Sequence, residues 1–152
     1  MAQSTKRSLN ELLVRLFNHV MDMEARAVIT PEYSDITNND MHIIEAIGLD
    51  EPRNMSVIAH KLSVTVSTLT TNMNGLEKKG YIRRERSEKD KRVVNVILTE
   101  KGRKAFFHHR DFHKKMIKAI VKDLSEEEME LLYRCLVNLN SFLEPKTEED
   151  TK

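Results

Sequence analysis

The sequence has little cysteine, proline or glycine and no tryptophan. Its single cysteine, Cys135, cannot form an intrachain disulfide, and its apolar neighbours indicate a buried thiol without a chemical role. Three prolines and four glycines exclude a collagen-like chain and favour helices. No apolar run approaches the roughly 20 residues that span a bilayer, and no secretory signal is visible, so we expect a cytoplasmic protein.

The net charge of +1 conceals a strong segregation of charge along the chain. Residues 53–122 hold 18 basic and 6 acidic side chains, whereas residues 1–52 and 123–152 both carry an excess of acidic side chains. A basic block between two acidic ends is typical of a segment that meets a polyanion such as nucleic acid. On charge alone, a solvated charged surface is the alternative.

Apolar spacing predicts long helices at both ends of the chain. Apolar residues recur every three or four positions from Leu9 to Met23. Near the other end, Ser125 and Glu128 form a capping box for a last helix that carries a second apolar stripe. Two such stripes have too little to pack on within one chain, so we expect residues 1–30 and 123–144 to be the dimerisation helices of a homodimer.

The central part of the chain predicts a helix-turn-helix. A short helix is expected over MHIIEAIGL, closed by Gly48, and another over Met55 to Leu62. The next helix has Thr65 as its N-cap and Gly80 just after its last turn.

A β-hairpin is expected to follow, because the strand-like runs YIRRER and VVNVIL flank a charged connector. Thr99 then caps a helix that continues to Lys122. The predicted fold class is mainly α, a winged helix-turn-helix over residues 37–98 with a two-stranded β-wing. Residues 99–122 form a linking helix, and residues 1–152 make up a single domain.

The stretch LEKKGYIRRERSEKDKRVVNVILTEKGR, Leu76 to Arg103, closely resembles the MarR family of winged helix-turn-helix regulators. The wing of that family carries Asp and Arg two positions apart, here Asp90 and Arg92. The resemblance covers most of the chain and implies a homodimeric transcription regulator that binds double-stranded operator DNA. No nucleophile-elbow, P-loop or zinc-protease motif occurs, so we expect no enzymatic activity.

A helix in the major groove, which is about 12 Å wide, reads base edges with the side chains of its N-terminal part. We expect Arg92 to enter the minor groove, with Asp90 orienting its guanidinium; alternatively, the two merely pair across an exposed turn. Thr71 and Gly75 depart from many relatives, which leaves the base preference open. The expected DNA contacts are Thr65, Val66, Ser67, Thr68, Thr70, Thr71, Asn74, Arg86, Lys89, Asp90, Lys91 and Arg92.

Within the MarR family, stretches such as TVSTLTTNMNGLEKKGYI and SEEEMELL are most similar to repressors of fatty-acid-synthesis genes in streptococci and related bacteria. That similarity implies no cofactor and a long-chain acyl-acyl carrier protein as effector and co-repressor. An apolar slot for the acyl chain is expected where the first, second and fifth helices cross, although a filled core is the alternative role for each residue. The expected slot residues are Phe17, Met21, Met41, Ile44, Phe106 and Phe112. The basic residues expected to dock the acidic carrier protein are Arg103, Lys104, Arg110, Lys114, Lys115, Lys118 and Lys122.

The six histidines suggest alternative functions. His109 and His113 are four residues apart and share one helical face, as metal ligands often do. The alternatives are a zinc-responsive regulator, as in some zinc-sensing MarR relatives, and a regulator that responds to a small aromatic ligand. Ordinary surface or half-buried histidines are the competing interpretation, and we expect no metal. The candidate ligands are Glu24, His42, His108, His109 and His113.

Overall fold

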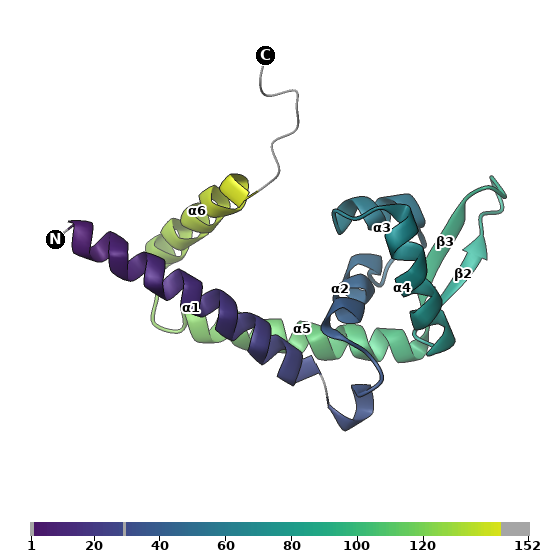
Figure 1. Cartoon of the computed structure of the whole chain (residues 1–152), viewed down its shortest axis with the longest axis horizontal. Coiled ribbons are helices and arrows are strands. Elements are labelled where there is room, and N and C mark those ends of the chain that lie inside the picture. The colour runs from purple at the N-terminus through teal and green to yellow at the C-terminus, as the bar shows by residue number, and fades with distance from the viewer. Residues whose placement is uncertain (1, 29, 144–152) are drawn as a thin grey trace, which may run out of the picture. The chain divides into compact units, whose positions relative to one another are not determined.

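The computed structural model describes residues 2–28 and 30–143, and the chain divides into two compact units, residues 1–113 and 114–152. The first unit contains the winged helix-turn-helix (Figure 1). Its elements are α1 (Ala2–Val28), the 3-10 turn η1 (Pro31–Tyr33), α2 (Asn38–Ile47), β1 (Arg53–Asn54), α3 (Met55–Lys61), α4 (Val66–Lys78), β2 (Ile82–Arg86), β3 (Val94–Leu98) and most of α5 (Glu100–Val121). The second unit contains the end of α5 and helix α6 (Glu126–Leu143).

Capping side chains and glycines set the helix ends. Thr37 and Asp40 form an unpredicted capping box at the start of α2, each side chain accepting a hydrogen bond from the other's backbone amide at 3.1 and 3.0 Å. Thr65 caps α4 as predicted, because its hydroxyl accepts a hydrogen bond from the amide three residues later. Gly48 and Gly80 follow α2 and α4 with φ angles of 75° and 79°, a conformation that favours glycine.

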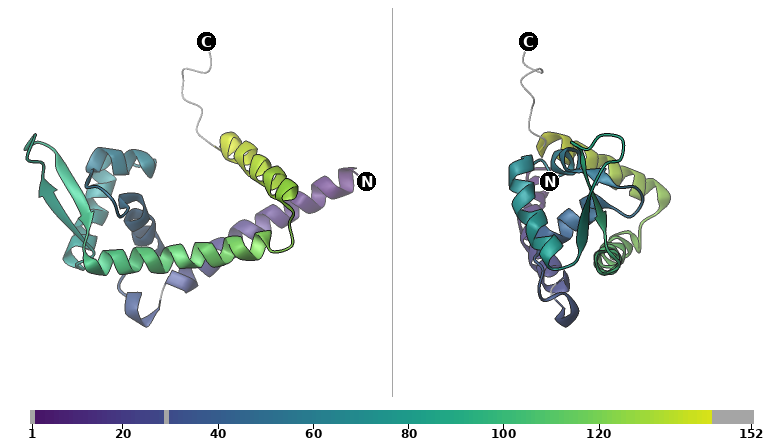
Figure 2. Two further views of the ribbon diagram at one scale, coloured as in Figure 1. Left: turned by 180° about the vertical axis from the view of Figure 1, so that it is seen from behind. Right: turned by 90° about the vertical axis from the view of Figure 1, so that its right-hand side faces the viewer.

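The wing belongs to a three-stranded antiparallel sheet of order β1-β3-β2. β2 and β3 pair as predicted, with Arg84 opposite Val96. The unpredicted β1 adds to the other edge of β3, and Arg53 of this strand donates a hydrogen bond to the Ala46 carbonyl of α2 at 2.9 Å. The tip of the β2–β3 hairpin extends past the neighbouring helices α3 and α4 (Figure 2).

A hydrophobic core holds α2, α3, α4 and the sheet together, with Met41, Ile44 and Leu69 fully buried. Helix α5 packs against this core through Ala105 and approaches the turn before β2 very closely. A Cβ atom on Gly102 would lie 2.0 Å from the carbonyl oxygen of Tyr81. Only glycine permits this contact, which places the start of α5 against the base of the wing.

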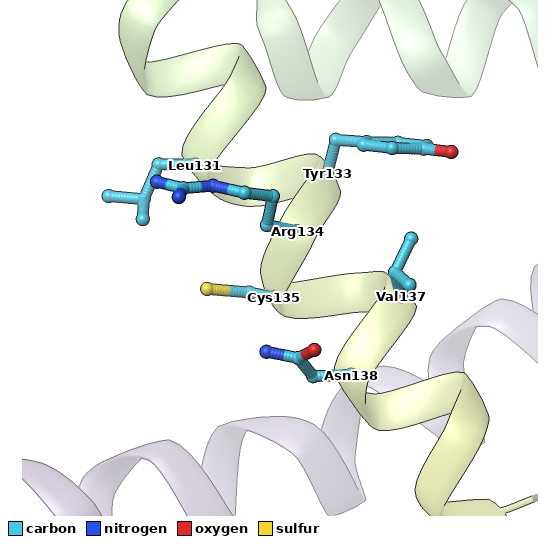
Figure 3. A pocket seen from close by; sticks show the side chains of 6 residues that line it. All are labelled: Leu131, Tyr133, Arg134, Cys135, Val137 and Asn138. Carbon is cyan, nitrogen blue, oxygen red and sulfur yellow. The ribbon is translucent and has the colours of Figure 1, made fainter.

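The helices α1 and α6 carry apolar side chains that the single chain leaves exposed. Phe17 and Met21 on α1 are 54% and 58% exposed. Helix α6 begins with the predicted capping box of Ser125 and Glu128 and has no buried residue. Cys135, expected to be buried, is exposed beside a shallow surface depression of α6 (Figure 3), because the apolar stripe of this helix is uncovered in one chain.

None of the helices within the described residues combines the length and the apolar composition that crossing a membrane requires.

Candidate nucleic-acid interface

Helix α4 buries one face and presents the other to solvent. Leu69 and Met73 are fully buried, so the core determines the rotation of the helix about its axis. The residues proposed to contact DNA therefore lie on the outer side, where Thr70 is half-buried and the others are exposed: Thr65, Val66, Ser67, Thr68, Thr71 and Asn74.

Several hydroxyls on this surface already have partners inside the protein. Thr65 and Thr68 share a hydrogen bond of 2.9 Å between their hydroxyls, and the Thr70 hydroxyl donates to the Val66 carbonyl at 2.7 Å. The hydroxyls of Ser67 and Thr71 form no hydrogen bond of this kind with the described residues. These two hydroxyls are therefore the most available of the α4 set for an external partner.

Arg84 on β2 connects the wing to helix α4. Its guanidinium binds the Glu77 carboxylate and donates to the Asn74 side-chain oxygen at 2.8 Å. The Arg84 amide also donates to Glu77, at 3.2 Å. Hydrogen bonds from Arg84 outweigh partial burial and hold the pKa of Glu77 below its usual value.

This arrangement has a geometric consequence for Asn74. Because its oxygen accepts from Arg84, its NH₂ group is directed away from that bond and remains a donor. Sequence reasoning did not select Glu77 or Arg84, although the opposite charges on either side of the Gly80 turn were a usable signal.

At the tip of the wing, Asp90 holds the backbone of the turn. Its carboxylate accepts a hydrogen bond from the Arg92 backbone amide at 2.9 Å. The alternative expectation, a pair between this carboxylate and the Arg92 guanidinium across the turn, is wrong for the described chain, where no such ion pair forms. The expectation that Asp90 orients Arg92 in the minor groove stays a prediction. The side chain of Arg92 is exposed, as are those of Arg86, Lys89 and Lys91. The tip therefore offers four cations to a partner while Asp90 stabilises the turn.

The six residues expected to form an acyl slot have different environments. Met41 and Ile44 are fully buried in the core, and Phe106 packs against that core. Phe17 and Met21 are more than half exposed, and Phe112 is half-buried. Met41 and Ile44 are therefore core residues in this structure, which is the alternative role given for them above, because protein atoms already surround each side chain.

The basic residues expected to dock a carrier protein are all exposed, and all except Lys122, which directly follows the helix, lie on α5. In the first unit, Arg103 donates to the Leu49 carbonyl at 3.1 Å, Lys104 lies 3.6 Å from Glu100, and the Arg110 guanidinium lies 4.7 Å from the centre of the Phe107 ring. In the second unit, the other four expected docking residues are Lys114, Lys115, Lys118 and Lys122, and all four are exposed.

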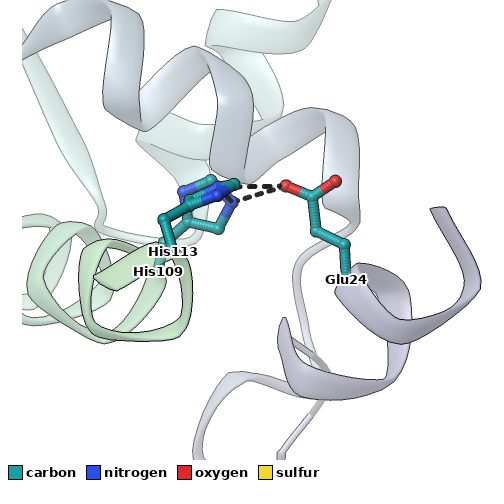
Figure 4. A group of neighbouring side chains, drawn as sticks. All are labelled: Glu24, His109 and His113. Atoms are coloured by element: carbon teal, nitrogen blue, oxygen red, sulfur yellow. Dashed lines mark hydrogen bonds and ion pairs between the residues drawn. The ribbon is translucent and has the colours of Figure 1, made fainter. Parts of the chain in front are cut away.

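Four of the five candidate metal ligands come together in the first unit as a histidine cluster, defined as Glu24, His42, His109 and His113. Nε2 of His109 lies 2.9 Å from Oε1 of Glu24, and Nε2 of His113 lies 3.4 Å from the same oxygen (Figure 4). Nε2 of His42 is 3.7 Å from it. His108 is wrong as a ligand, because its Nε2 lies 2.9 Å from the Ala27 carbonyl oxygen instead.

Glu24 is 3% exposed and His109 is 1% exposed, so the cluster has a buried centre. Burial alone would raise the pKa of Glu24, but hydrogen bonds from His109 and Asn38 and electrostatic interactions with the neighbouring imidazoles outweigh it, and the pKa is lowered. Glu45, which was not selected from the sequence, has its Oε2 3.6 Å from Nδ1 of His109.

Comparisons with solved structures match this architecture. Streptococcus pneumoniae FabT, solved in complex with DNA, is 40% identical over 97% of this chain and 99% of that chain, with a TM-score of 0.84. The DNA complex of Staphylococcus aureus MepR is 28% identical over 87% of this chain and 94% of that chain, with a TM-score of 0.69.

Sequence comparisons agree. HTH-type transcriptional regulator PchR of Bacillus subtilis (strain 168) is 28% identical over 99% of this chain and 96% of its own length. The uncharacterized HTH-type transcriptional regulator YfiV of the same organism is 31% identical over 76% and 72%, respectively. The MarR family model matches residues 36–94. Together with the exposed polar face of α4 and the basic wing, these matches show that the chain belongs to the MarR family of winged helix-turn-helix transcription regulators.

Proposed function

We propose that the protein binds operator DNA as a homodimer and represses fatty acid biosynthesis genes. The observation that carries DNA binding is the outward polar face of α4 beside a wing tip with four exposed cations. In this proposal α4 enters the major groove, Arg92 enters the adjacent minor groove, and the remaining wing cations meet phosphates. The resemblance to repressors of fatty-acid-synthesis genes supports the target class, and a genomic target implies action in the cytoplasm.

The exposed apolar side chains of α1 and α6 support the homodimer. Residues such as Leu12, Leu16 and Leu136 are more than half exposed in the single chain, and apolar surface of this kind is typical of a protein interface. Residues 1–30 and 123–144 would then be dimerisation helices, while residues 37–98 bind DNA and residues 99–122 link the two. Two-fold symmetry predicts an inverted-repeat operator with half-sites about 10 to 11 base pairs apart.

The proposed co-repressor is acyl carrier protein that bears a long acyl chain. The exposed cations of α5, three in the first unit and three in the second, together with Lys122 just after the helix, support docking of an acidic protein. The exposed Phe17 and Met21 support an apolar acyl site near α1, whereas Met41 and Ile44 would have to leave the core to contribute. We therefore place the acyl chain on the exposed members of the expected slot.

The experiment is to titrate carrier protein with a long acyl chain into the dimer, with and without operator DNA. Thermodynamic linkage requires that a co-repressor which strengthens operator binding also binds more tightly when operator is present, by the same factor. Unacylated carrier protein is the matched control. Equal binding of both forms, or unchanged operator affinity with the acylated form, would overturn the co-repressor proposal.

Two further titrations would identify another effector if acylated carrier protein does not change operator affinity. A phenolic acid tests the small-aromatic alternative, and zinc tests the metal-responsive alternative. A change in operator affinity with one of these, and none with the acylated carrier, would reassign the effector without affecting the proposal of DNA binding.

A further inference from the structure

The outward face of α4 carries few side chains that can discriminate one base from another. From Thr65 to Glu77 the chain has no lysine or arginine, the residues that most often read guanine. The exposed hydroxyls on this face can rotate to donate or to accept, so each tolerates several bases. Asn74 differs, because its exposed amide carries the donor and the acceptor on separate atoms. The base preference of this face therefore depends on which way the Asn74 amide points.

Arg84 determines the direction of that amide. Helix α4 and strand β2 lie side by side (Figure 1), and the Arg84 guanidinium donates to Oδ1 of Asn74 at 2.8 Å. A guanidinium has only donors, so turning the amide over would place two donor groups against each other. Among the described residues, Arg84 is the only one that hydrogen-bonds the Asn74 side chain. The amide is therefore held with its oxygen toward the wing and its NH₂ group available to a partner.

Glu77 in turn holds Arg84 in place. The Glu77 carboxylate accepts hydrogen bonds from the Arg84 side chain and, at 3.2 Å, from its backbone amide. These bonds keep the pKa of Glu77 below its usual value, so the carboxylate is charged at neutral pH. Because Glu77 and Asn74 are three residues apart on one helix, a single planar guanidinium reaches both. The orientation of the amide is thus established within the protein before DNA binds.

We propose that Arg84 is a positioning residue for base recognition, which holds the Asn74 amide so that its NH₂ group faces the DNA. In the major groove, adenine, guanine and thymine all offer acceptors, whereas cytosine offers only a donor. Asn74 then selects against cytosine at the base that it faces. The inference rests on the proposed function, because it requires α4 to lie in the major groove. It adds a specificity role for a side chain that acts through another residue.

The test begins with DNA that the parent protein itself selects. Duplexes enriched by the full-length parent from a randomised library serve as the probe, and fluorescence anisotropy measures the affinity of every single base-pair substitution. The position at which Asn74→Ala loses the parent's base preference is the one that Asn74 reads. At that position we expect cytosine to weaken binding by the parent about two- to tenfold, the range for one hydrogen bond.

Arg84→Met removes the guanidinium but keeps a long side chain, so the Asn74 amide becomes free to turn. Discrimination against cytosine should then disappear at the position that Asn74 reads and at no other. The matched control is Arg83→Met, which removes a cation from the same strand; Arg83 is exposed and pairs with Glu85 at 3.1 Å. The control should weaken binding to all duplexes alike and leave the base preference unchanged, because a lost cation acts through phosphates.

Asn74→Asp tests the donor role with a side chain of the same shape. A carboxylate still accepts from Arg84 but has no donor, so cytosine should become the favoured base at this position. In the Asn74→Ala background, Arg84→Met should cause no further change in base preference. A purely structural role of Arg84 would instead alter binding in both backgrounds, and circular dichroism checks the fold of each variant.

If Arg84→Met keeps the parent's base preference, or changes it equally in the Asn74→Ala background, Arg84 does not act through Asn74. If Asn74→Ala alters the preference at no position, or Asn74→Asp does not gain cytosine, the donor role fails. Should Arg84→Met not fold, Arg84→Lys replaces it, because lysine cannot bond both partners in one plane. Enrichment of no duplex by the parent would reject specific DNA binding as well, whereas an unchanged preference in Arg84→Met rejects only the role of Arg84.

Discussion

Two glycines in helices should respond in opposite ways to the same added methyl group. At Gly102 the new Cβ would lie 2.0 Å from the Tyr81 carbonyl oxygen and 3.1 Å from its carbonyl carbon, both backbone atoms. At Gly75 the Cβ would meet no atom within 4 Å. Because both residues lie inside helices, alanine improves the intrinsic helix propensity at each position by about 1 kcal/mol.

For Gly102→Ala, the clash should outweigh this gain. Overpacking that moves backbone costs about 3 kcal/mol at the upper end of the usual range, which leaves a net loss of about 2 kcal/mol in the free energy of unfolding. For a chain of this size that loss lowers the Tm by about 4 to 8 °C. Gly75→Ala, the matched control, should instead raise the Tm by about 2 to 4 °C.

Thermal unfolding followed by circular dichroism measures both changes. The variants and the parent are compared at one protein concentration, because the stability of an associating protein depends on concentration. If Gly102→Ala is as stable as the parent, the close approach of α5 to the base of the wing does not exist in solution. If Gly75→Ala is equally destabilised, a general intolerance of α-helical substitution would replace the steric explanation.

Three other measurements test DNA binding and acid stability. Operator affinity should fall with salt with a log–log slope of about −5 or steeper, because six or more phosphates are neutralised per dimer; a slope near zero would contradict phosphate contacts. Arg92→Ala should weaken operator binding by about 1 to 3 kcal/mol, whereas Ser67→Ala should change base preference, both followed by fluorescence anisotropy on operator variants; parental affinity of Arg92→Ala would refute the minor-groove role. Hydrogen bonding from Tyr81, and then from Lys101, lowers the pKa of Asp35. The stability this carboxylate contributes is therefore present above its unfolded pKa of about 4 and is lost as pH falls through the folded pKa. Asp35→Asn should therefore lose less Tm than the parent between neutral and acidic pH. An equal loss of Tm in the variant and the parent would argue against these hydrogen bonds.

Arg84, Glu77 and Asn74 link the wing to the exposed face of α4. A side chain on β2 holds the amide of a residue on the exposed face of α4, so we expect a movement of the wing to displace that amide. Such coupling depends on one guanidinium that contacts two partners in a fixed planar geometry, which lysine does not reproduce.

Much of the helical structure follows from the sequence, because the deciding interactions are local. The Thr65 cap, the Gly80 terminus and the capping box of Ser125 and Glu128 each involve groups within a few residues of one another. Apolar periodicity likewise shows which side of α4 must be buried, since a helix has a fixed repeat. The winged helix-turn-helix and its outward polar face could therefore be predicted before any contact was known.

Tertiary structure alone decided which side chains meet across elements and how each is oriented. Glu24 and His109 are 85 residues apart in the chain, and no periodicity indicates that their side chains lie 2.9 Å from each other. The two-residue strand β1 is too short to show alternation, and it forms because β3 offers an unpaired edge. Asp90 and Arg92 are only two positions apart in sequence, yet the turn directs the carboxylate to the Arg92 backbone amide and leaves the guanidinium exposed. Composition cannot specify such choices, because they depend on the direction in which a folded backbone projects each side chain.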